Sequence, residues 1–175
     1  DRRKLMLTAA IPRSVLPRAV PDLTAGWRTA EQIRYWPIER GKLIVVPRVN
    51  TPGLKQNTRW LPGEPEATRN ANRNFPRTAG PNEARTVPVR ALWEFVRKQQ
   101  PDWVVDLHEG YDFQVANPKS DGSSIIYFDT PEMQAIAKLI QQEVNATIDD
   151  PKRQIVRLSK SGPIDGGLVR AADQA

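Results

Sequence analysis

Trp103-Val104-Val105-Asp106-Leu107-His108 is the stretch that decides the fold. The run is short, largely apolar and preceded by Pro101, which predicts a buried strand over 103–107. Just before it, apolar residues recur with helical spacing at positions 89, 92, 93 and 96, and Pro101 ends the predicted helix. A helix that leads into a buried strand is the unit from which α/β layer folds are built.

The rest of the chain alternates in the same way. A strand over 43–46 is apolar throughout, so we expect it to be buried on both faces. The other strands and helices follow from apolar runs, apolar periods, capping residues (Thr24, Thr130) and prolines. They are strands at 4–11, 124–128 and 154–157, and helices at 25–36, at 131–146 and from 167 onward. The order predicts an α/β fold with a mixed, mostly parallel sheet flanked by helices.

Residues 50–86 are rich in Pro, Gly, Asn and Arg and have no sustained apolar period, so we predict a long loop. Loops of this length in compact domains are usually functional or disordered. The total of 175 residues predicts a single domain over 1–175.

Composition excludes several classes of protein. A chain that is 39% hydrophobic and 26% charged is typical of a soluble globular protein. Neither a membrane-spanning run nor a convincing signal peptide is found, so we expect no membrane partner, and the compartment stays open. The absence of cysteine excludes a disulfide scaffold, a cysteine-ligated zinc and a cysteine nucleophile.

The net charge of +6 is unevenly placed, because residues 1–60 hold 12 of the 26 Lys and Arg but only 4 of the 20 Asp and Glu. Basic segments of this kind can bind nucleic acid. Here the arginines are scattered and do not alternate with aromatic residues, so we expect no nucleic-acid partner. The basic half is then either a solvated surface or a site that attracts carboxylates.

His108 is the only histidine, and it stands directly after a predicted strand. Sites in open α/β sheets form beyond the carboxyl ends of strands, and a neutral imidazole there can ligate zinc. A carboxylate or carbonyl must then orient its second nitrogen. Asp106, two residues before, is too close in sequence to be assumed for that role. The alternative is a hydrogen-bonded histidine at a strand end.

Asn72 and Arg73 lie in the predicted loop, in the string Asn72-Arg73-Asn74-Phe75-Pro76. A guanidinium binds a carboxylate through two hydrogen bonds, and an adjacent amide adds a donor. Arg59 is a further cation of the same loop. The alternative for all three is a solvated loop side chain.

The order of these motifs resembles the zinc carboxypeptidase superfamily, and within it the branch of succinylglutamate desuccinylase and aspartoacylase. After its second strand the chain has Pro47-Arg48-Val49-Asn50-Thr51-Pro52-Gly53, then Arg59, then Asn70-Ala71-Asn72-Arg73-Asn74-Phe75-Pro76. A helix, a strand and Asp106-Leu107-His108 follow. The resemblance covers roughly residues 4–11 and 25–130.

The resemblance implies a zinc-carboxypeptidase-like fold and a zinc-dependent hydrolase of amide bonds next to a free carboxylate. It implies that His108 is a zinc ligand, that Asn72 and Arg73 hold the substrate carboxylate, and that Arg59 polarises the scissile carbonyl. The partner is then a small molecule or peptide with a free carboxylate. Neither the acyl group nor the oligomeric state follows from it.

The chain also departs from the family's pattern. The His-x-x-Glu ligand pair should follow the first strand, but the corresponding positions hold Pro12 and Val15, or Val20 and Leu23, depending on the alignment. The general-base glutamate should lie on a strand beyond Ala175. We therefore expect a partial domain that is truncated at its C-terminus, inactive as this chain and doubtful as a zinc binder. A degenerate paralogue, a truncated product and a sequence altered between 12 and 24 all fit this pattern, and a metal-free protein that binds carboxylates or peptides is the alternative function.

Overall fold

The computed structural model describes residues 3–9, 25–108, 110, 112–159 and 162–175. The chain divides into two compact units, of which unit 1 comprises 1–109 and 164–175 and unit 2 comprises 110–163. The prediction of one partial domain over 1–175 stays a prediction.

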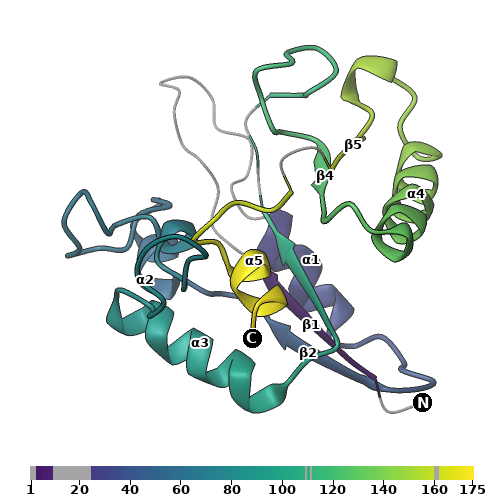
Figure 1. Ribbon diagram of the computed structural model, residues 1–175. Coiled ribbons are helices and arrows are strands. Elements are labelled where there is room, and N and C mark those ends of the chain that lie inside the picture. Colours follow the sequence, from purple (N-terminus) through teal and green to yellow (C-terminus); the bar gives the residue numbers. More distant parts are fainter. Residues whose placement is uncertain (1–2, 10–24, 109, 111, 160–161) are drawn as a thin grey trace. The chain divides into compact units, whose positions relative to one another are not determined.

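Unit 1 contains a three-stranded parallel sheet with the strand order β2-β1-β3 (Figure 1). Its elements in chain order are β1 (Lys4–Ala9), α1 (Ala25–Ile33), β2 (Lys42–Val46), α2 (Thr51–Lys55), η1 (Ala71–Arg73), α3 (Val87–Gln99), β3 (Trp103–Leu107) and α5 (Leu168–Asp173).

The sheet of unit 1 is covered on both faces because its apolar side chains alternate along the strands. On one face Leu7 packs with Ala30 and other residues of α1. On the other face Met6 and Ile44 pack with residues of α3 and α5, among them Leu168. The predicted α/β fold is therefore confirmed at the level of a small parallel sheet flanked by helices.

Three details of unit 1 differ from the predictions. β2, an edge strand, is less buried than predicted, because only Ile44 is buried and Leu43, Val45 and Val46 are half-buried. The first helix ends at Ile33 rather than at 36, and turns precede Pro37. The predicted loop contains α2, which begins because Asn50 caps Gly53 N–H and a proline occupies its first turn. Thr24 and residues 10–11 lie outside the described residues.

Unit 2 is a smaller α/β segment in which β4 and β5 pair in parallel. Its elements are β4 (Ser124–Ile126), α4 (Pro131–Asn145), η2 (Pro151–Arg153) and β5 (Val156–Leu158). Thr130 caps α4 as predicted, accepting a hydrogen bond from Met133 N–H at 3.2 Å. The apolar stripe of α4 is only partly buried, because Ile140 and Val144 are exposed.

Within the described ranges, every helix is too short or too polar to cross a membrane.

Candidate functional site

The candidate site begins at the carboxyl ends of β1 and β3, which are paired in register. Thr8 lies opposite Asp106, and its hydroxyl donates to Asp106 Oδ1 at 2.6 Å. Because side chains alternate along a strand, Asp106 and Val104 point to one face, which is the face covered by α3 and α5. His108 follows two residues later, just beyond the end of β3.

The imidazole of His108 is oriented by Asp106, the residue that sequence reasoning had left unassigned. His108 Nε2 lies 2.7 Å from Asp106 Oδ2, and the His108 side chain is 39% exposed whereas that of Asp106 is 8% exposed. Since a carboxylate accepts hydrogen bonds, Nε2 is the donor and Nδ1 is the nitrogen left for a ligand.

The pKa of His108 reflects opposing influences. Burial lowers this pKa, while the negative charge of Asp106 and its hydrogen bond raise it, and the charges of Arg59 and Arg73 lower it. The net direction is upward from the usual 6.5. Two arginines that are remote from His108 in sequence are therefore close enough to act on it.

Arg59 is positioned by the buried side chain of Asn50. Asn50 Oδ1 accepts from Gly53 N–H at 3.0 Å, and Asn50 Nδ2 donates to the carbonyl of Trp60 at 2.9 Å. The Arg59 guanidinium lies 4.7 Å from the centroid of the Trp60 ring, a favourable cation–π distance. One asparagine thus joins the start of α2 to the segment that carries Arg59.

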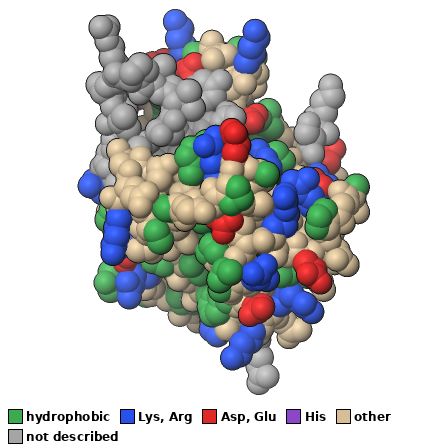
Figure 2. All heavy atoms as spheres, turned by 90° about the vertical axis from the view of Figure 1, so that its left-hand side faces the viewer, with side chains coloured by type: hydrophobic (Ala, Val, Ile, Leu, Met, Phe, Trp, Pro, Cys, Tyr) green, Lys and Arg blue, Asp and Glu red, His purple; other side chains and the backbone are tan. Residues whose placement is uncertain are grey.

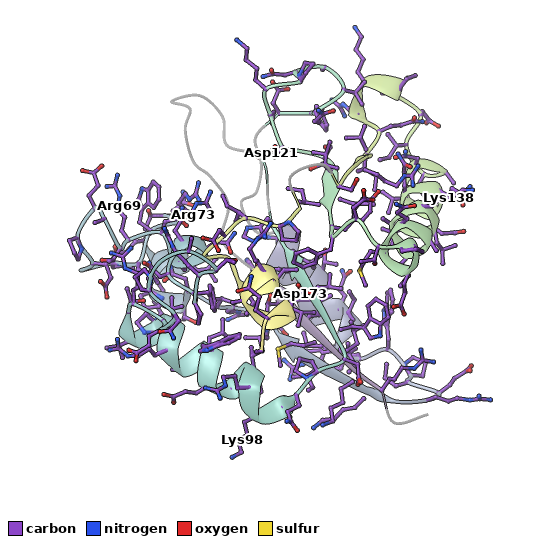
Figure 3. All side chains as sticks on the ribbon, in the orientation of Figure 1. Arg69, Arg73, Lys98, Asp121, Lys138 and Asp173 are labelled. Carbon is purple, nitrogen blue, oxygen red and sulfur yellow. The ribbon has the colours of Figure 1, made fainter. Side chains whose placement is uncertain are left out.

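Asn72 and Arg73 are positioned by the C-terminal segment of unit 1. Asn72 Oδ1 accepts from Leu168 N–H at 3.3 Å. Because its oxygen takes this backbone donor, the amide nitrogen of Asn72 is assigned to the opposite side, where it can serve as a donor. Arg73 Nη1 donates to the carbonyl of Asn72 at 2.7 Å. Figure 3 labels Arg69 and Arg73, which both belong to the segment between α2 and α3.

Gly166 and Gly167 support the Asn72–Arg73 pair, and sequence reasoning missed them. Gly166 has φ +77°, and a Cβ there would lie 3.0 Å from the carbonyl oxygen of Arg73. A Cβ on Gly167 would lie 2.9 Å from Asn72 Oδ1. The Gly-Gly pair before α5 was the available signal, since adjacent glycines mark a turn or a close backbone approach.

The zinc that the resemblance implies fits these residues only in part. His108 Nδ1 suits one ligand position, but both oxygens of Asp106 already accept hydrogen bonds. Asp112 accepts from Phe113 N–H and from the Asn117 amide. Three His, Cys, Asp or Glu side chains placed to hold a metal ion are not found in the described part of the chain. Glu109 and residues 12–24, including Pro12, Val15, Val20 and Leu23, lie outside that part.

Two further features lie at the surface. A hollow of about 330 Å³ borders β2 and is lined by Arg34, Ile38, Leu43, Val45 and Pro47. On the face that Figure 2 displays, Lys and Arg side chains are scattered, with Asp and Glu side chains among them. This distribution offers no continuous basic stripe on that face.

Comparisons with known proteins yield no match among protein-family models, curated proteins or solved structures. The resemblance to the zinc carboxypeptidase superfamily therefore stays a prediction, and so do the zinc cofactor and the hydrolase activity.

Proposed function

We propose that this chain binds a small molecule or peptide through a free carboxylate at Arg59, Asn72, Arg73 and His108. The proposal is supported by the placement of Arg59 and Arg73, from separate parts of one loop, close enough to His108 that the charge of each lowers the pKa of its imidazole. Two guanidinium groups near one imidazole form a locally cationic site with donors for an anion.

The placement of Asn72 favours a carboxylate over other anions as the ligand. Its oxygen is held by Leu168 N–H, so its amide nitrogen is a directed donor next to Arg73. A guanidinium and a fixed amide match the planar geometry of a carboxylate.

A zinc-dependent hydrolase that cleaves amide bonds next to such a carboxylate is the second candidate. It is favoured by the orientation of His108, which leaves Nδ1 for a metal. Bound zinc would activate water and polarise a carbonyl. Within that reaction, Arg59 would stabilise the developing oxyanion, while Asn72 and Arg73 would hold the substrate.

Calorimetry with a hexapeptide and with its C-terminal amide tests the proposal. The free acid should bind at least about tenfold more tightly than the amide, since one charged hydrogen-bonded contact contributes roughly 1.5–3 kcal/mol. Arg73→Ala should abolish the difference, while Arg97→Ala, an exposed arginine of α3, should preserve it. Equal binding of acid and amide, or an unaffected Arg73→Ala, would contradict the proposal.

A chelator separates the two candidates. Acid-selective binding that persists in chelator identifies the metal-free binding function. Binding that is lost in chelator and restored by zinc, together with release of the C-terminal residue, identifies the hydrolase.

A further inference from the structure

Thr8 is fully buried, and its hydroxyl is hydrogen-bonded to a carboxylate. It lies at the carboxyl end of β1 with 0% of its surface exposed. Its hydroxyl donates to Asp106 Oδ1 at 2.6 Å. A buried hydroxyl is costly unless it is hydrogen-bonded, so valine, which has the same shape, would suit a purely structural position in a strand better.

The hydrogen bond from Thr8 extends to the surface through Asp106. One oxygen of this carboxylate accepts from Thr8, and the other lies 2.7 Å from His108 Nε2. With both oxygens engaged, the carboxylate plane is fixed relative to the sheet. The chain of contacts runs from a residue of the central strand to the exposed imidazole.

We propose that Thr8 is the positioning residue of this site, holding the Asp106 carboxylate so that His108 keeps Nε2 inward and presents Nδ1. The ligand-binding consequence rests on the proposed function, whereas the orientation of His108 does not. Thr8 acts through Asp106 and touches no ligand itself.

Within the described strands, the register places residue 8 beside Asp106. Thr8 is the register partner of Asp106 on β1, and β1 is the neighbour of β3 within the sheet. The other neighbour of Thr8 across the sheet is Val46, which carries no polar group. Removal of the hydroxyl would therefore leave Asp106 Oδ1 without its donor, and a buried carboxylate oxygen would seek water or rotate.

Proton NMR tests the orientation directly, because the chain has one histidine and its ring N–H needs no assignment among several. In the unmodified protein the Nε2–H proton of His108 should resonate downfield and exchange slowly with water. Thr8→Val should accelerate that exchange, because the Asp106 carboxylate that accepts the ring proton would no longer be held in place. Thr8→Ser, which keeps the hydroxyl, should restore slow exchange.

Two further measurements keep the proposal open to refutation. If Thr8→Val does not fold, the Thr8 hydroxyl proton of the unmodified protein should still be protected and close to Asp106 by nuclear Overhauser effect. Absence of this protection would overturn the proposal, as would unchanged exchange of the ring proton in a folded Thr8→Val.

Acid-selective peptide binding should weaken in Thr8→Val and recover in Thr8→Ser. If no peptide binds any form while the ring proton responds as expected, the proposed ligand fails and the positioning role stands.

Discussion

The two halves of the candidate site are held by different kinds of structure. His108 stands at the end of β3, where the backbone ladder with β1 aligns Thr8 and Asp106. Arg59 and Arg73 stand in a long loop that has no such ladder. Single buried side chains and the C-terminal segment hold that loop instead. Many hydrogen bonds stabilise a strand ladder together, whereas the loop depends on a few. Single substitutions should therefore perturb the loop more than the strand end.

The largest loss of stability is expected from a substitution in α5, the helix whose first residue contacts the loop through Asn72. Leu168 is 2% exposed and anchors this six-residue helix in the core. Leu168→Ala should lower the free energy of unfolding by about 2–5 kcal/mol, as typical for buried leucines. It should also weaken acid-selective binding, because loosened packing of α5 would displace the backbone N–H of residue 168 that holds Asn72. Urea denaturation and calorimetry measure the two effects.

Leu139→Ala is the matched control, because Leu139 is 58% exposed. It should change the free energy of unfolding by less than about 0.5 kcal/mol. Equal losses in the two variants would mean that α5 does not anchor the loop.

Asn74 offers the next test, within the loop itself. It is 0% exposed, and its amide donates to the carbonyls of Thr68 and Asn70. Asn74→Ala should cost about 2–3 kcal/mol in urea denaturation, because it leaves two carbonyls without this donor. The exposed neighbour Asn82 serves as control, and a comparable loss in Asn82→Ala would show that the loop does not depend on Asn74 in particular.

Substitution of Asn50 tests whether the structure of the loop is needed for binding. Asn50→Ala removes both a helix cap and the link to Trp60, so we expect a loss of about 1–2 kcal/mol together with weaker acid-selective binding. Thr130→Ala removes the cap of α4 in unit 2 and should lower stability without affecting binding. Unchanged binding in Asn50→Ala would mean that the position of Arg59 does not matter for ligand binding.

The smallest effect concerns pH. The backbone N–H of Thr78 donates to Asp165 Oδ1 at 3.0 Å and holds the pKa of that carboxyl below its usual 3.8. Because the folded-state pKa is lowered, the ionised group adds stability above the unfolded pKa, and this contribution disappears as pH falls through the folded pKa. Urea midpoints between about pH 6 and pH 3 should therefore fall slightly less in Asp165→Asn. Identical pH dependence of stability in the two proteins would mean that the Asp165 carboxylate does not stabilise the loop.

The strands and long helices were predictable because their signals are local. Apolar runs marked β2 and β3, and a proline with a preceding capping residue marked the start of α4. The edge position of β2 was not predictable, since an apolar run does not reveal whether both neighbours exist. Helix α2 was hidden because its cap depends on Asn50 within a sequence that is otherwise rich in turn residues.

The sequence singled out the members of the candidate site, and their functional role stays a prediction; it did not reveal the contacts that hold them. Arg59, Asn72, Arg73 and His108 were singled out by residue type and order. The contacts of Thr8, Gly166 and Gly167 with this group were not foreseen, because a threonine in a strand and a glycine pair before a helix have many ordinary uses.

The sequence by itself determined which segments become strands and helices, because those choices depend on neighbours a few residues apart. Only the tertiary structure decided that Thr8 meets Asp106, 98 residues away, and that Asn72 meets Leu168, 96 residues away. Such contacts arise from strand register and from the packing of α5 on the sheet. Residue spacing along the chain does not contain that information, because register and packing are set by the whole core.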